Sequence, residues 1–358
     1  MASSLTLALR NQAKQCGRLG SILYSGLLER AATSTDAGLG GICGRLLREF
    51  SNDPPQSLLA LRFLGAVHRL VLQGDGPDLM PCYQGDILDL DETWKRFCQV
   101  LQTNEQNLPA LIRRPVRTNE VGRSAALLPG FLEVARQTGL QLRLLEVGAC
   151  AGLNLRWDRY FYEAQDEAWG DAASGVSIRG AYRHHHPSLN GEAPVIERSG
   201  CDDNPLHVAS EEDTLTLLSY VWPDHEIRVQ RMRAAIELAR RIPVTIDKAR
   251  AEEWIERQLK WPSKQRATVV YHSMFQDSMT SLARARFQFV MEEAGNRATK
   301  DAPIAWLRME PGGAETEIRL RIWPGGKDTL VALAGFHGQW VESPNVAEGG
   351  ASRPVRLS

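Results

Sequence analysis

The chain has 358 residues, of which 43 % are apolar, and its formal net charge is −1. This length and composition exclude global disorder and are sufficient for two domains with substantial cores. The near-zero charge supplies no field that attracts nucleic acid or an anionic membrane surface. We therefore expect a small-molecule substrate and neither nucleic acid nor a membrane as a partner. No apolar run approaches the roughly 20 residues that cross a bilayer.

Cysteine and histidine usage gives no sign of a metal or a disulfide framework. The six cysteines are scattered and no two are spaced as Cys-x-x-Cys, so we expect a reducing, cytoplasmic environment. The run His184-His185-His186 stands before Pro187, with no acid or cysteine at ligand spacing. Adjacent side chains in a loop point in different directions, so we expect no metal site.

The first 115 residues have the pattern of an all-helical domain. Apolar residues recur at helical spacing from Leu58 to Leu72, and Gly74-Asp75-Gly76-Pro77 ends that helix. Another helix begins at Trp94, and nothing in this part alternates like a strand. We expect a helical cap domain over residues 1–115.

From residue 118 onward, strands and helices alternate. Thr118 or Asn119 is predicted to cap a helix through Ala135, and residues 142–147 form a buried strand that ends at Gly148. Further short apolar runs and helical stretches follow in turn. The strands are expected at 195–196, 244–246, 267–271 and 304–307, and the helices at 226–241, 249–260 and 279–294.

This alternation predicts a parallel α/β sheet with right-handed crossovers. The run 317–323 then alternates, Pro324-Gly325-Gly326 turns the chain, and 329–336 returns it as an antiparallel hairpin. The α/β domain is expected over residues 116–345, followed by a C-terminal tail at 346–358.

The candidate ligand loop follows the first strand, where Glu146-Val147-Gly148 leads into Gly152. The glycines allow a tight turn and leave room for a ligand against the main chain, and the helix expected to open there offers unpaired N–H groups. The acid at the strand end disfavours a dinucleotide pyrophosphate, and the Gly-x-Gly-x-x-Gly order is absent. A carboxylate suits a ligand with a cationic ammonium or sulfonium group instead.

Two later acids stand where an adenosine-containing ligand needs acceptors. Asp202, with Asp203 as the fallback, follows the second strand and can accept from ribose hydroxyls. Asp247 follows the third strand and can accept from an adenine amino group. Each alone is equally typical of a loop or cap acid, so their order and spacing together carry the prediction.

Short sequence stretches along the chain share the pattern of a known family. They are residues 20–24, 118–124, 145–148, 151–155, 157–160, 200–202, 204–205, 221–224, 272–273, 308–311, 323–326 and 337–338. In these stretches the chain resembles a bacterial family known as domain of unknown function 2332, and the resemblance covers almost the whole chain.

The resemblance implies a class I methyltransferase-like Rossmann fold, with a mostly parallel seven-stranded sheet closed by the antiparallel hairpin, and S-adenosylmethionine as cofactor. It places Glu146, Gly148, Gly152 and Asn154 at the amino-acid end of the cofactor. Cys150 lies in the same loop, but it stands where the family usually carries serine, so the resemblance gives no support to cysteine chemistry there.

The remaining candidates surround this loop. His272 and Gln276 follow the fourth strand and are the predicted catalytic groups, with His272 as a possible base for the methyl acceptor. Asn119 and Arg123 precede the first strand and are predicted to line the crevice, although Arg123 equally suits a salt bridge. Glu310 and His337 are weaker candidates. The aromatic residues 157 and 160–162 are predicted to pack a helix into the core.

Two other functions fit parts of the sequence. Cys150 and Arg156 have the Cys-x-x-x-x-x-Arg spacing of cysteine phosphatases, and Trp222-Pro223-Asp224 supplies the tripeptide of their acid loop. The tripeptide comes after the cysteine rather than before it, so we interpret Asp224 as the cap of the helix that follows. A non-catalytic, cofactor-binding protein of methyltransferase fold is the third possibility. The methyl acceptor and the oligomeric state are not legible.

Overall fold

The computed structural model describes residues 3–36 and 41–344, which form two compact units. The helical unit contains the chain up to Asn119 together with Leu206–Arg240. The α/β unit contains Glu120–Pro205 and the chain from Arg241 onward. The expected tail at 346–358 lies outside the described residues.

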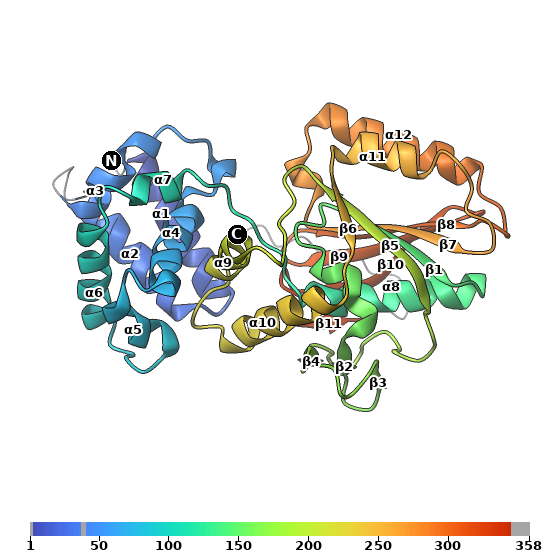
Figure 1. The fold of residues 1–358 in the computed structure, drawn as a ribbon, viewed down its shortest axis with the longest axis horizontal. Helices are drawn as coiled ribbons and strands as arrows, with labels where there is room; N and C mark the ends of the chain where they lie inside the picture. The colour runs from blue at the N-terminus through green and yellow to red at the C-terminus, as the bar shows by residue number, and fades with distance from the viewer. Residues whose placement is uncertain (1–2, 37–40, 345–358) are drawn as a thin grey trace, which may run out of the picture. The chain divides into compact units, whose positions relative to one another are not determined.

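The helical unit contains no strand among its described residues, as the sequence predicts (Figure 1). Its α-helices are α1 (Ser4–Arg18), α2 (Ile22–Asp36), α3 (Ile42–Leu47), α4 (Leu59–Gln73), α5 (Met80–Gln84), α6 (Leu90–Thr103), α7 (Leu108–Ile112), α9 (Glu211–Ser219) and α10 (Glu226–Arg241). The core is formed by their apolar faces, and Trp222 belongs to it.

The segment 206–240 joins the helical unit because α9 packs against α4. A Cβ added at Gly65 would lie 2.5 Å from the Tyr220 ring, so only glycine allows this approach. Arg69 donates to Thr216 Oγ1 at 3.0 Å, and the ring of buried His68 lies 3.2 Å from the Ser219 carbonyl oxygen. A division of the sequence at residue 115 does not anticipate this return of the chain.

Asp224 caps a helix that precedes it by 200 residues in sequence. Its carboxylate accepts from the Ser21 hydroxyl at 2.8 Å and from the Leu23 N–H at 3.1 Å, and Ser21 Oγ accepts from the Tyr24 N–H. These bonds satisfy the first N–H groups of α2. The expectation that Asp224 caps the helix after it is therefore wrong, because its oxygens face α2.

The α/β unit is built on an eight-stranded sheet in the order β11-β10-β9-β8-β7-β1-β5-β6. The strands are β1 (Leu142–Val147), β5 (Val195–Asp202), β6 (Thr245–Lys248), β7 (Ala267–Ser273), β8 (Ile304–Pro311), β9 (Thr316–Trp323), β10 (Lys327–Ala334) and β11 (Val341–Glu342). Strands β6, β5, β1, β7 and β8 are parallel, and β9 to β11 continue as an antiparallel meander.

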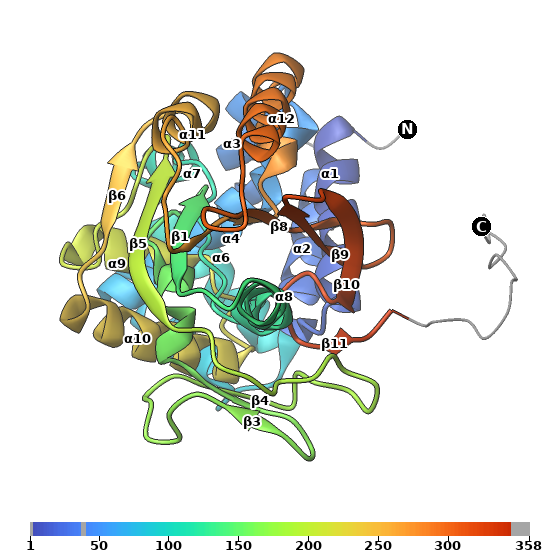
Figure 2. The same ribbon diagram turned by 90° about the vertical axis from the view of Figure 1, so that its right-hand side faces the viewer.

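Helices cover both faces of this sheet. Figures 1 and 2 show α8 (Arg123–Thr138) on one face and α11 (Ala251–Gln258) with α12 (Ser281–Asn296) on the other. The parallel strands follow the chain in the order 3-2-1-4-5 of a doubly wound fold, so the order reverses between β1 and β7. In such sheets ligands bind at the carboxyl ends of the strands beside this reversal.

Three local expectations are corrected. The sheet has eight strands rather than seven, because the two-residue strand β11 extends the predicted hairpin, which itself is confirmed as β9 and β10. Helix α8 begins at Arg123 with Gly122 at its N-cap position, so neither Thr118 nor Asn119 caps it.

The third correction concerns the connection after β1. No α-helix follows Gly152, where the chain forms a 3-10 segment, η4 (Leu153–Arg159). A small three-stranded sheet follows, formed by β2 (Phe161–Glu163), β3 (Ala168–Trp169) and β4 (Ser177–Arg179). Its strand order is β3-β2-β4. Trp157 still packs into the core, stacked on Phe131 with the ring centroids 4.3 Å apart.

Candidate functional site at the carboxyl ends of β1, β5 and β7

The loop after β1 is held by the end of the neighbouring strand β5. Gly148, Cys150 and Gly152 all have positive φ angles of 68°, 52° and 66°. Asp202 fixes the cysteine in this conformation, because its Oδ2 accepts from the Cys150 N–H at 3.0 Å. The Ala149 N–H donates to the Cys201 carbonyl at 3.0 Å. The loop is thus rigidly built, and a non-glycine residue at φ 52° marks it as a functional candidate.

Gly148 in this loop and Gly200 in the adjoining strand β5 provide close packing rather than open space. A Cβ added at Gly148 would lie 2.3 Å from Cδ2 of Phe275, and one added at Gly200 would lie 2.7 Å from Cβ of Ala149. The sequence predicts that Gly148 leaves room for a ligand. The space that a Gly148 side chain would occupy is instead filled by the Phe275 ring, so the prediction is wrong for this space.

Glu146 is a buried carboxyl group without an ion pair among the described residues. Its side chain is 3 % exposed, and the Tyr271 hydroxyl lies 3.3 Å from Oε2. Burial raises the pKa of Glu146 to about 8, although the Tyr271 hydroxyl and the charges of Arg156 and Arg123 oppose the rise and Asp202 adds to it. Near neutral pH a buried acid with this pKa is mostly uncharged, and a bound cation would favour its charged form.

Asn154 lies beside Glu146, and the oxygen of its side-chain amide accepts no hydrogen bond from the described residues. Its Nδ2 donates to the Glu120 carbonyl at 3.2 Å, which fixes the orientation of the amide. The Tyr271 hydroxyl that faces Glu146 also lies 3.2 Å from the Asn154 carbonyl oxygen. The side-chain Oδ1 is buried and has no partner among the residues described. Buried acceptors are normally satisfied, so this oxygen calls for a donor from a ligand or an ordered water.

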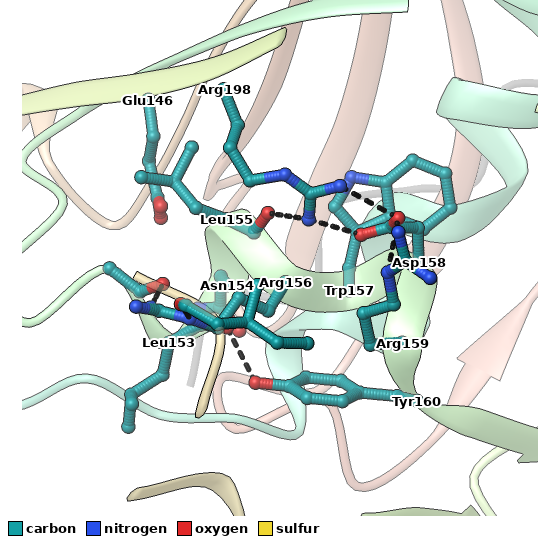
Figure 3. A network of polar contacts seen from close by, with 12 residues as sticks. Glu146, Leu153, Asn154, Leu155, Arg156, Trp157, Asp158, Arg159, Tyr160 and Arg198 are labelled. Carbon is teal, nitrogen blue, oxygen red and sulfur yellow. Dashed lines mark hydrogen bonds and ion pairs between the residues drawn. The ribbon is translucent and has the colours of Figure 1, made fainter. Parts of the chain in front are cut away.

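Charged side chains hold the 3-10 segment after Gly152 in place (Figure 3). Arg198 of β5 forms two bonds with Asp158, at 2.6 and 2.9 Å, and one with the Leu155 carbonyl at 3.0 Å. Arg156 donates to the Gly152 carbonyl at 2.6 Å and to the Ile242 carbonyl at 2.7 Å. Because the segment is short and not α-helical, the anion-attracting helix start expected from the sequence is not present here.

The two predicted adenosine-binding acids both have structural partners. Asp202 ends β5, and its Oδ1 accepts from the Asn204 N–H at 2.8 Å while Oδ2 holds Cys150. Asp247 lies inside β6, and its Oδ2 accepts from the Trp254 indole at 2.6 Å. A carboxylate oxygen can accept more than one hydrogen bond, so these structural bonds do not by themselves exclude a ligand contact.

His272 has both ring nitrogens engaged and is 1 % exposed. The Trp306 indole can only donate, and it lies 3.1 Å from Nε2, so Nε2 carries no proton and Nδ1 donates to Glu310 Oε1 at 2.6 Å. This arrangement favours a positioning role over proton transfer. Gln276 is half-buried at the start of the 3-10 turn η5 (Gln276–Ser278), and its main-chain N–H also donates to Glu310.

The other two predicted site residues fall in different units. Arg123 belongs to the α/β unit and reaches the carboxyl end of β7, donating to the Ser273 carbonyl at 3.5 Å and to the Phe336 carbonyl at 3.2 Å. Asn119 is the last residue of the first segment of the helical unit, and it is buried. The structure therefore brings Arg123 near the loop after β7, whereas Asn119 stays a prediction.

The geometry defines an α/β protein whose doubly wound sheet has buried polar groups at its switch point. Residues 7–343 match the family model described as "Uncharacterized protein conserved in bacteria (DUF2332)", so the chain belongs to this family. No curated protein and no solved structure matches the chain.

No helix in the ranges 3–36 and 41–344 is long and apolar enough to cross a membrane. No group of three or more His, Cys, Asp or Glu side chains is arranged to hold a metal ion in the same part of the chain.

Sequence reasoning missed two aromatic residues at the site: Tyr271, which contacts Glu146 and Asn154, and Phe275, which packs against Gly148. Tyr271 appears in the sequence only as part of an apolar run. Phe275 lies in a short connection that has no pattern of its own. Their roles arise from the pairing of β1 with β7, which aligns Glu146 with Tyr271. No signal in the sequence indicates that pairing directly.

Proposed function

We propose that the protein is an S-adenosylmethionine-dependent methyltransferase that acts on a small molecule. The observation that carries this proposal is the pair of buried acceptors at the switch point, the unpaired carboxyl group of Glu146 and Oδ1 of Asn154. An ammonium group supplies both the N–H donor that Asn154 lacks and the positive charge that ionised Glu146 requires.

The other residues of the α/β unit fit the rest of such a cofactor. Asp202 at the end of β5 can accept from ribose hydroxyls while it holds the loop, and Asp247 on β6 can accept from an adenine amino group. Gly148 and Gly152 maintain the turn that brings the main chain to this edge of the sheet. When bound, adenosylmethionine supplies a methyl group that is already activated by the sulfonium. The protein then contributes alignment and exclusion of water.

A phosphatase acting through Cys150 fits the geometry poorly. The Arg156 guanidinium that would clamp a phosphate is buried against two main-chain carbonyls. Asp224, the candidate general acid, belongs to the helical unit and caps α2. The charge of an ionised Glu146 would also repel a phosphate.

A binding protein without turnover shares every contact named above, so the distinction needs an activity measurement. The test incubates the protein with methyl-labelled adenosylmethionine and a small-molecule extract of a bacterial cell. Label transferred by the wild type and lost in Asp202→Ala supports a methyltransferase. Cofactor binding without transfer supports the binding protein. Hydrolysis of a chromogenic phosphate ester that is lost in Cys150→Ser would overturn both.

A further inference from the structure

The connection after β7 places an aromatic ring against the loop after β1. Phe275 lies two residues beyond the end of β7, and its ring occupies the position that a Cβ of Gly148 would need, 2.3 Å from Cδ2. The ring is tilted by 56° relative to the His272 ring, with the centroids 6.2 Å apart, and the side chain remains half-exposed. Phe275 therefore forms a wall at the carboxyl ends of β1 and β7.

Glu310 holds this wall in position. Its Oε1 accepts three hydrogen bonds, from His272 Nδ1 at 2.6 Å, from the Phe275 N–H at 3.0 Å and from the Gln276 N–H at 3.3 Å. Burial alone would raise the pKa of the Glu310 carboxyl, but the hydrogen bond from His272 and those from the two N–H groups together lower it. The acceptor is thus an ionised carboxylate, which makes stronger hydrogen bonds than a neutral acid.

The backbone at Met274, next to Phe275, is strained, which indicates that the conformation of this connection has a functional role. Met274 has a φ angle of 54°, a left-handed conformation that costs a non-glycine residue free energy. The Met274 N–H donates to the Met309 carbonyl at 2.8 Å, and Arg123 donates to the carbonyl of Ser273. Bonds from β8 and α8 therefore fix the peptide group that joins Ser273 to Met274.

We propose that Phe275 is a specificity-determining residue that favours an onium ligand, that is, one with a sulfonium or ammonium group. Glu310 is the positioning residue that holds the Phe275 ring in place. This inference rests on the proposed function. An aromatic ring attracts a sulfonium through its π-face, and it does so at the same edge of the sheet as the Glu146 carboxylate. The neutral thioether of the demethylated product receives no such attraction from the ring, whereas its ammonium group can still reach Glu146. The wall thus discriminates the charged methyl donor from its demethylated product.

The test measures the dissociation constants of adenosylmethionine and adenosylhomocysteine by calorimetry, in the wild type and in Phe275→Ala, Phe275→Tyr, Glu310→Ala and the double alanine variant. Thermal denaturation checks that each variant is folded. The ratio of the two constants is the readout, because a merely structural substitution weakens both ligands equally. We expect Phe275→Ala to reduce the preference for adenosylmethionine by about three- to tenfold, and Phe275→Tyr to retain it.

Glu310→Ala should reduce the preference by a similar factor, and the double variant should show no further reduction, because Glu310 acts through Phe275. An unchanged ratio in folded Phe275→Ala would overturn the inference and leave the proposed function intact. Additive effects in the double variant would overturn the role of Glu310. Absence of binding of either ligand to the wild type would instead overturn the proposed function.

Discussion

The buried carboxyl group of Glu146 predicts an unusual dependence of stability on pH. Its pKa lies at about 8 in the folded protein against an ordinary value of 4.5, because burial penalises the charged form. The folded state therefore retains a proton that the unfolded chain loses. The stabilisation from this group is complete below pH 4.5 and is lost as the pH rises through about 8. Substitution by the neutral isostere, Glu146→Gln, should remove this dependence.

The magnitude follows from linkage at about 1.36 kcal/mol per pH unit. Between about pH 5 and pH 9 the free energy of unfolding of the wild type should fall by about 4 kcal/mol relative to Glu146→Gln. The assay is urea-induced unfolding followed by the fluorescence of the buried tryptophans of the α/β unit, Trp254, Trp306 and Trp323. The exposed acid Glu192 provides the matched control, and Glu192→Gln should follow the wild type. Parallel profiles for the wild type and Glu146→Gln would refute the reasoning.

Further predictions follow from single contacts. Gly148→Ala should destabilise the α/β unit by about 2 kcal/mol or more, since the Cβ meets Phe275, whereas Gly180→Ala, where φ is 70° with open space, should cost only about 1 kcal/mol; urea midpoints decide. His272→Ala should cost about 2–4 kcal/mol, because it leaves the Trp306 indole without a partner and removes one of the three hydrogen bonds to Glu310. Glu310→Gln should flatten the acid limb of the stability profile. The lowered pKa of Glu310 gives a stabilisation that is present above pH 4.5 and lost as the pH falls below it. Asp224→Ala should lower the thermal midpoint of the helical unit through a loss of about 1–2 kcal/mol, and an unchanged midpoint would show that the cap of α2 contributes nothing.

The alternation of apolar runs and helical stretches predicts most of the fold. The parallel strands, the hairpin of β9 and β10 and the helices α11 and α12 lie where this pattern places them, with ends that shift by a few residues. Periodicity succeeds for these elements because each buries one continuous face. It fails for β2 to β4 and for β11, since strands of two or three residues are too short to show an alternation.

The connection after Gly152 shows why local sequence was insufficient. The sequence predicts that a helix opens after Gly152, but the backbone of Arg156 is not helical, at φ −112° and ψ 18°. Arg156 reaches the Ile242 carbonyl, and Arg198 binds Asp158. Both contacts come from parts of the chain that are distant in sequence, and they stabilise the 3-10 segment against the local preference.

The candidate site was predictable in its acids and not in its aromatic residues. The order of Glu146, Asp202 and Asp247 along alternating strands places them at one edge of a parallel sheet, and the structure has them there. The sequence did not predict the aromatic partners of these residues. Tyr271 contacts Glu146, Trp254 contacts Asp247 and Phe275 packs against Gly148. These contacts arise only from strand pairing and helix packing.

The most direct measurement of the central claim is a calorimetric titration of the full-length protein with adenosylmethionine at about pH 8, beside the same titration of Glu146→Gln. We expect saturable binding to the wild type and an affinity at least about tenfold lower for the variant, because the amide cannot supply the negative charge that the cation requires. Equal affinity in the two proteins, or no heat of binding in the wild type while its fold is intact, would contradict the assignment of this edge of the sheet to a cationic ligand.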